Sequence, residues 1–172
     1  HNKGQGVYIF EFEKGKKVVY KPHRLDTEIF YHNLVQRIGT FWGMEMFNPV
    51  VLNKKQYGWV EFVDYIPCKN KKEVEQYFKR LGILIFANYL VSANDIHYEN
   101  LIAHGEYPVI IDLETILHNK KTWLAKTANM KINQKLDGSV LNSGILPKYI
   151  WGSNGIEGIN ISASNGEEGQ EF

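Results

Sequence analysis

The feature that most constrains the fold is a long segment, NKKEVEQYFKRLGILIFANYLVSA, which runs from Asn70 to Ala93. It begins polar and amphipathic and ends almost wholly apolar. This gradient predicts a helix that starts at the surface and runs into a hydrophobic core. The apolar run within it, from Leu81 to Val91, is too short to span a bilayer, so we predict no membrane span. We interpret the segment as a buried helix of a globular domain.

The residues before this helix predict a small, mostly antiparallel sheet with one helix of its own. GVYIFEFEKGKKVVYKP has the pattern of two strands joined by a turn at Lys14-Gly15. NPVVLNKKQYGWVEFVDYIP predicts a second hairpin, with its turn at Asn53 to Gln56. Between the hairpins, Asp26 is suited to cap the start of a helix that ends near residue 38. Its predicted apolar face consists of Ile29, Phe30, Leu34 and Ile38.

The residues after the long helix predict a third hairpin, NLIAHGEYPVIIDLE, with its turn at His104 to Tyr107. The predicted fold class is therefore α+β. We divide it into a β-rich subdomain at residues 1–67 and a second subdomain at residues 68–172. The lysine-rich stretch from Lys120 to Lys135 is interpreted as a solvated face, with a peptide-docking surface as the alternative.

Composition excludes several classes of function. The formal net charge is +1, so nothing global indicates nucleic acid or a membrane surface as a partner. The single cysteine, Cys68, permits no intrachain disulfide, which suits a reducing cytosol. The sequence has no G-x-x-x-x-G-K-[ST] run, which argues against a P-loop. It also has no H-E-x-x-H and no paired cysteines, which argues against a protease or structural zinc site.

Polar groups gather around the third hairpin, in NDIHYENLIAHGEYPVIIDLET. Asp95, His97 and Asn100 form the pattern D-x-H-x-x-N, and Asp112 follows an apolar strand. Asp95 could accept the proton of an incoming hydroxyl group, and His97 could assist it, stabilise charge or brace the loop. Asn100 and Asp112 offer the hard oxygen ligands that Mg²⁺ prefers. A hairpin between these two residues would bring them close together.

Lys21 ends an apolar strand in VVYKP, and Glu28 lies on the helix that follows. A lysine in this position can reach phosphate oxygens, and Glu28 could pair with it and hold it. The alternative is a surface lysine and a solvated glutamate, because charged side chains are mostly exposed. The order of lysine, glutamate, buried helix and polar hairpin suits phosphoryl transfer, which depends on positioning and on charge neutralisation.

Four motifs in this order, VVYKP, YGWVEFV, ANDIHYENLIA and PVIIDLET, resemble the dehydratase domain of class II (LanM-type) lanthipeptide synthetases. The resemblance extends from about His1 to Glu157 and is strongest from Gly58 to Thr115. SVLNSGILP is also similar to a segment that follows the catalytic hairpin in that family.

The resemblance implies a two-lobed core similar to that of kinases, in a cytoplasmic bacterial enzyme of lantibiotic biosynthesis. Such an enzyme uses ATP and Mg²⁺ to phosphorylate serine and threonine of a ribosomal precursor peptide, then eliminates phosphate to leave dehydroamino acids. A separate zinc-dependent cyclase domain acts next. By motif, the residues implied are Lys21 for phosphate binding, Asp95 and His97 for activating the acceptor hydroxyl, and Asn100, Asp112 and the adjacent Glu114 for the metal. The linker from Glu61 to Ile66 would carry adenine on its backbone.

The sequence departs from related patterns in three respects. Protein kinases write the last metal motif D-F-G, whereas this chain has D-L-E, so their activation-segment logic need not apply. The glycine loop is reduced to Gly4 and Gly6. The arginine and threonine used for elimination lie beyond the hairpin in the family, and we expect these residues, like the cyclase zinc ligands, to lie outside this segment.

Two other functions remain open from the sequence. The same motifs would serve a kinase-like phosphotransferase that acts on a small molecule or a lipid. They would also occur in a kinase-like module that binds a peptide without catalysis. Three results distinguish these functions. Loss of water from a peptide indicates the dehydratase, retained phosphate indicates another phosphotransferase, and failure to bind nucleotide indicates the non-catalytic module.

Overall fold

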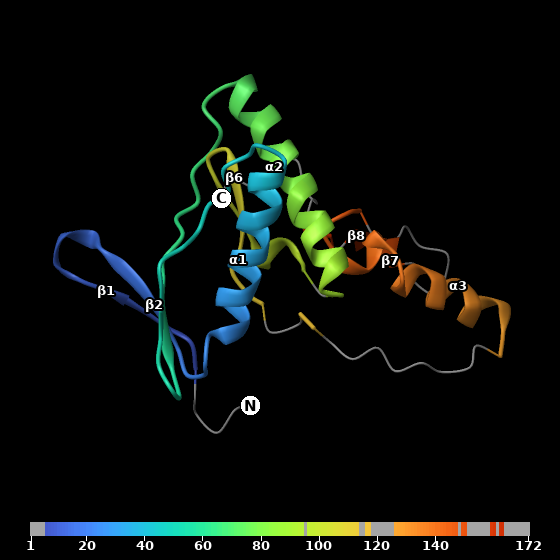
Figure 1. Ribbon diagram of the computed structural model, residues 1–172, viewed down its shortest axis with the longest axis horizontal. Coiled ribbons are helices and arrows are strands. Elements are labelled where there is room, and N and C mark those ends of the chain that lie inside the picture. The colour runs from blue at the N-terminus through green and yellow to red at the C-terminus, as the bar shows by residue number, and fades with distance from the viewer. Residues whose placement is uncertain are drawn as a thin grey trace. The chain divides into compact units, whose positions relative to one another are not determined.

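The computed structural model describes residues 6–94, 96–113, 116–117, 126–147, 149–150, 159–160 and 162–163 (Figure 1). Within these residues the chain is a mixture of α-helices and small β-sheets, which confirms the predicted α+β class. It forms two compact units. One contains residues 1–80 and 103–109, and the other contains residues 81–102 and 110–172. The proposed division after residue 67 stays a prediction.

A four-stranded antiparallel sheet forms from the two predicted N-terminal hairpins. Its strands are β1 (Tyr8–Glu11), β2 (Lys17–Lys21), β3 (Val51–Asn53) and β4 (Gly58–Glu61), in the order β1-β2-β4-β3. A short 3₁₀ helix, η1 (Glu13–Gly15), makes the turn between β1 and β2. Lys21 at the end of β2 lies opposite Gly58 at the start of β4.

Gly58 permits the start of the first helix to approach the sheet. A Cβ atom at position 58 would collide with the Leu25 side chain, which is fully buried. Helix α1 (Asp26–Phe41) begins one residue after Leu25. Asp26 is therefore the first helical residue rather than the N-cap, which corrects the sequence prediction. The Leu25 backbone N–H donates instead to Asn53 Oδ1 at 2.9 Å.

The buried face of α1 differs from the predicted one. Ile38 is buried as predicted, but the other buried apolar residues are Tyr31 and Val35, whereas Phe30 is 46% exposed. The predicted face was rotated, because a helical pattern with apolar residues at both 29–30 and 34–35 allows more than one stripe. The helix also continues beyond Ile38, to Phe41.

The predicted long helix is confirmed as α2 (Lys71–Leu90). Its first residues are mostly exposed, and Leu81, Leu84 and Ala87 are buried, as the gradient predicts. Phe86, Tyr89 and Leu90 are 47%, 48% and 51% exposed, so the apolar end is buried on one face only, not throughout as predicted. No helix of the described residues is long and apolar enough to cross a membrane.

The third predicted hairpin is confirmed as β5 (Leu101–His104) and β6 (Tyr107–Ile110). Gly105 in its turn has φ +59, a conformation that glycine adopts without a steric penalty. A 3₁₀ turn, η2 (Tyr98–Asn100), leads directly into β5. Asn100 ends this turn, and His97 and Asp112 lie just before the turn and just after the hairpin.

The described residues of the C-terminal part form four short elements. They are α3 (Ala128–Asp137), η3 (Val140–Ser143), β7 (Tyr149–Ile150) and β8 (Ile159–Asn160). Thr127 caps α3 by accepting a hydrogen bond from Met130 N at 3.2 Å. Of the lysine-rich stretch, Lys126, Lys131 and Lys135 are exposed as expected for a solvated face, and residues 120 and 121 lie outside the described residues.

Candidate functional site

The structure pairs Lys21 with Glu28, as the sequence predicted. Lys21 Nζ lies 3.3 Å from Glu28 Oε1, and the two residues are only 8% and 4% exposed. Alternation along β2 places Lys21 on the face opposite to Tyr20, and Pro22 follows directly. Glu28 reaches it from the first turn of α1. The alternative of a surface lysine and a solvated glutamate is therefore wrong, while the nucleotide-binding role stays a prediction.

His23 is a second partner of Glu28 that the sequence analysis missed. Its Nε2 lies 3.5 Å from the same Oε1 atom that receives Lys21. This contact could have been predicted from YKPH, where His23 is only two residues after Lys21. Pro22 between them restricts the backbone, so the two side chains stay close together. Glu28 thus contacts two groups: the buried Lys21 ammonium and the partly exposed His23 imidazole.

His32, one helical turn after Glu28, is also buried and was not singled out from the sequence. Burial lowers the pKa of His32 to about 4, with the Glu28 carboxylate opposing the shift and the Lys21 ammonium adding to it. The imidazole is therefore neutral at pH 7. A neutral ring beside the ion pair leaves Lys21 as the buried cation of this cluster.

This burial predicts a pH dependence of stability. Unfolded His32 takes up a proton near pH 6.5, whereas folded His32 does so only near pH 4, so stability falls as pH drops through this window. The shift corresponds to a loss of about 3 kcal/mol in the free energy of unfolding. Urea titrations at several pH values should show a flatter dependence in His32→Leu than in the unsubstituted protein. Parallel curves for the two proteins would contradict the assignment.

The loop that precedes the third hairpin is held by the segment after α3. Ile96 is 1% exposed, and its backbone N–H donates to Ser143 O at 3.1 Å. Gly144 has φ +81, and a Cβ atom there would lie 2.5 Å from Ile96 O. This explains why SVLNSGILP carries a glycine at that point. The segment is similar to one in the lanthipeptide synthetases, but its contact with the loop was not predicted from the sequence.

His97 and Asn100 contact each other across the 3₁₀ turn. Asn100 Nδ2 lies 3.3 Å from His97 Nε2, and Asn100 N donates to His97 O at 2.9 Å. When Nε2 accepts from the amide, the ring carries its proton on Nδ1, which lies 3.8 Å from a Glu99 carboxylate oxygen. This arrangement occupies the basic nitrogen, so it favours bracing among the three roles considered for His97.

The hairpin brings the Asn100 backbone beside the residue that precedes Asp112. Ile111 N donates to Asn100 O at 3.1 Å, and Asp112 is partly buried. The predicted proximity of Asn100 and Asp112 therefore has a direct structural basis. Asp95 and Glu114, the other predicted residues of this region, lie outside the described residues.

The chemistry of the donors in this region fits Mg²⁺. Asp112 supplies a carboxylate and Asn100 an amide oxygen, both of the hard type that Mg²⁺ takes. Among the described residues no group of three or more His, Cys, Asp or Glu could hold a metal ion. Mg²⁺ does not require such a cage, because it commonly uses one or two carboxylates together with substrate phosphates.

The predicted adenine linker, Glu61 to Ile66, is tied to the hairpin at its far end. Ile66 N donates to Ala103 O at 2.8 Å, and Gly105 N donates to Ile66 O at 2.7 Å. His104 Nδ1 lies 2.8 Å from Asp64 O. The linker backbone therefore has a fixed course, which a segment that binds a ligand through main-chain groups needs.

The comparisons with known proteins identify the family. The whole chain, residues 1–172, matches the family described as Domain of unknown function (DUF4135), and the chain belongs to it. It is also 33% identical over 155 residues to the Lacticin 481/lactococcin biosynthesis protein LcnDR2 of Lactococcus lactis subsp. lactis. The matched region covers 83% of this chain and 17% of that relative, so the chain spans a small part of its length. These matches confirm the resemblance to a segment of LanM-type lanthipeptide synthetases.

Proposed function

We propose that this chain is the part of a lanthipeptide synthetase that binds ATP and Mg²⁺ and phosphorylates serine and threonine of a precursor peptide. The relative at 33% identity is named for the biosynthesis of lacticin 481/lactococcin, which supports a role for this chain in making such a product. Phosphate elimination would follow in the complete enzyme and leave a dehydroamino acid. The proposal includes a kinase-like, two-lobed arrangement and a cyclase domain elsewhere in the synthetase.

The buried ion pair of Lys21 and Glu28 is the observation that carries the proposal. Removing a lysine ammonium and a carboxylate from water costs free energy that their attraction only partly returns. A site that must present one fixed cation to phosphate oxygens gives a functional reason for this cost. The hydrogen bonds that fix the linker backbone and join Asn100 to Ile111 further support the proposal, because they hold two of the segments that it assigns to ATP and Mg²⁺.

In the proposed reaction, the substrate hydroxyl oxygen bonds to the γ-phosphorus of ATP, and the bond from that phosphorus to ADP breaks. The hydroxyl proton passes to the Asp95 carboxylate. His97 braces the loop through Asn100, which agrees with its hydrogen bond. Asn100 and Asp112 would hold Mg²⁺, which neutralises phosphate charge when bound.

The product of the complete synthetase tests this function directly. A precursor peptide incubated with ATP and Mg²⁺ should lose the mass of one water molecule for each residue modified. Trapped intermediates should carry phosphate on serine or threonine. Retained phosphate on a small molecule or lipid, with an unchanged peptide, would instead support a different phosphotransferase. Absence of thermal stabilisation by Mg²⁺ and ATP would support a non-catalytic module.

Asp112→Asn is expected to raise the Mg²⁺ concentration for half-maximal phosphorylation by about ten- to a hundredfold, because an amide replaces a charged ligand. Asp137→Asn removes the same charge at the exposed end of α3 and serves as the matched control. Phosphorylation should be followed by mass spectrometry across a Mg²⁺ titration. Equal Mg²⁺ requirements in the two variants would show that Asp112 is not a metal ligand.

A further inference from the structure

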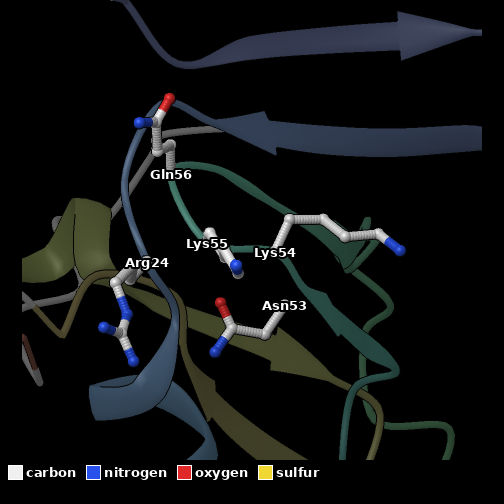
Figure 2. Close-up of a pocket in the computed structure, with 5 residues that line it drawn as sticks. All are labelled: Arg24, Asn53, Lys54, Lys55 and Gln56. Atoms are coloured by element: carbon white, nitrogen blue, oxygen red, sulfur yellow. The ribbon is translucent and has the colours of Figure 1, made fainter.

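A cavity of about 700 Å³ lies at the turn between β3 and β4, beside the residues that precede α1. Arg24, Asn53, Lys54, Lys55 and Gln56 line it (Figure 2). Among the described residues, this lining contains three cationic side chains and two amides, and no carboxylate or apolar side chain. We call it the basic pocket. None of its residues belongs to the predicted phosphoryl-transfer site.

The wall of the basic pocket is fixed by hydrogen bonds rather than left as a loose loop. Lys54 N donates to Tyr57 O at 2.8 Å and closes the turn. Asn53 then ties the turn to the start of α1, because its Oδ1 accepts from Leu25 N at 2.9 Å and its Nδ2 donates to Asp26 Oδ1 at 3.0 Å. Both sides of the pocket are thus held at a set distance from each other.

The charge of the basic pocket is positive even when its nearest carboxylate is counted. Asp26 Oδ2 accepts from Arg24 Nε at 2.6 Å, and this hydrogen bond holds the pKa of the Asp26 carboxyl below its usual value. Asp26 therefore remains ionised and offsets one cation. Lys54 and Lys55 are exposed and form no ion pair within the part of the chain that the structure describes.

We propose that the basic pocket binds an acidic segment of the polypeptide substrate. This inference rests on the proposed function, in which the substrate is a peptide. A single phosphate group is best held by donors that converge on one point. Figure 2 shows a different layout, with Lys54 extending away from Arg24 and Lys55 lying between them. An extended peptide, which advances about 3.3 Å per residue, can place successive carboxylates against such separated cations.

The basic pocket would select and retain the peptide by electrostatic attraction. Exposed cations of this kind act mainly on the association rate and on the choice of partner, and salt screens them. The pocket would therefore recognise acidic residues at a distance in sequence from the serine or threonine that is modified. Substrates with the same reactive residues and no acidic segment would bind more weakly.

The direct test uses two fluorescently labelled probes, a short oligoglutamate and an oligoglutamine of equal length. Fluorescence anisotropy with the complete synthetase should show binding of oligoglutamate that weakens as salt is added. The double variant Lys54→Glu, Lys55→Glu should bind oligoglutamate at least about tenfold more weakly. The matched control is Lys71→Glu, Lys72→Glu, which makes the same change in net charge at the exposed start of α2 and should bind as the unsubstituted protein does.

Three results would overturn the proposal. The first is that both double variants lose binding equally, and the second is that the protein binds oligoglutamate and oligoglutamine with equal affinity. The third is that inorganic phosphate displaces oligoglutamate at the same concentration as unlabelled peptide does. The last would identify a site for free anions. Circular dichroism melting of each variant establishes that the fold is retained.

Nucleotide binding separates this proposal from the proposed function. The Lys54→Glu, Lys55→Glu variant should retain thermal stabilisation by Mg²⁺ and ATP, since its substitutions leave Lys21 and Glu28 intact. If the unsubstituted protein binds oligoglutamate through these lysines but never phosphorylates a peptide, the proposed function fails and the acidic-peptide site stands. If the Lys54→Glu, Lys55→Glu variant phosphorylates the peptide and binds oligoglutamate as the unsubstituted protein does, the acidic-peptide site is refuted and the proposed function stands.

Discussion

Lys21→Met is expected to lower the rate of peptide phosphorylation about 100- to 1,000-fold, the range seen when one preorganised donor to a transition-state charge is removed. The Lys21 ammonium is held 3.3 Å from Glu28 in a buried position and cannot be replaced by a solvated cation. Methionine keeps an unbranched side chain of nearly the same length and removes its charge. Single-turnover phosphorylation of the precursor peptide, measured by mass spectrometry, reports the loss.

The single variant also leaves Glu28 as a buried carboxylate without its main cation, which destabilises the fold in its own right. The double variant Lys21→Met, Glu28→Leu separates the two effects. It removes both charges, so its free energy of unfolding should recover much of what Lys21→Met loses. If Lys21 binds phosphate, the double variant stays inactive although it is stable. Recovery of phosphorylation together with stability would show that the lysine serves only the fold.

Glu28→Gln should have a smaller effect on phosphorylation than Lys21→Met. The amide retains an oxygen that can accept from Lys21, while the charge that holds the ammonium is lost. His23 provides a control for the second contact of Glu28, because His23→Gln leaves the Lys21 pair in place. Phosphorylation in His23→Gln should therefore remain close to that of the unsubstituted protein.

The elements that sequence predicted well are those whose pattern is local. Hairpins can be predicted from alternating apolar residues and from turn residues, as in the strands on either side of Gly105. The apolar gradient of α2 can be predicted from the residues of that helix alone. The pairing of Lys21 with Glu28 was also accessible, because a strand end and the first turn of the next helix lie close together by connectivity.

The elements that sequence analysis missed depend on contacts between distant segments. Asp26 was assigned as the N-cap, but Asn53 reaches across from the next hairpin to bind the Leu25 N–H. The buried face of α1 was predicted only in part, because the pattern of the helix alone does not say which apolar stripe is buried. The support of Ile96 by Gly144 likewise joins residues far apart in the chain, and no local pattern encodes it.

Arg80→Met is expected to lower the free energy of unfolding by about 3 kcal/mol, because it removes the donors of a buried cation and leaves their acceptors behind. Arg80 is 6% exposed. Its Nε donates to Glu45 O at 2.8 Å, and its Nη1 donates to Glu106 O at 3.2 Å. Nη2 lies 3.4 Å from the Glu106 carboxylate, and the guanidinium lies 4.1 Å from the centre of the Tyr107 ring. Urea unfolding followed by tryptophan fluorescence measures the loss.

Lys79→Met, the adjacent substitution on the exposed side of α2, is the matched control and should change stability by no more than about 0.5 kcal/mol. Arg80→Lys tests the geometry of the fork, because one ammonium cannot donate to Glu45 O and Glu106 O in the directions that a guanidinium does. The free energy of unfolding of Arg80→Lys should lie between those of the unsubstituted protein and Arg80→Met. The contrary result is that Arg80→Met lowers the free energy of unfolding no more than Lys79→Met does. That result would mean that the hairpin turn is held by its own backbone and by Ile66, and that Arg80 only packs beside Tyr107.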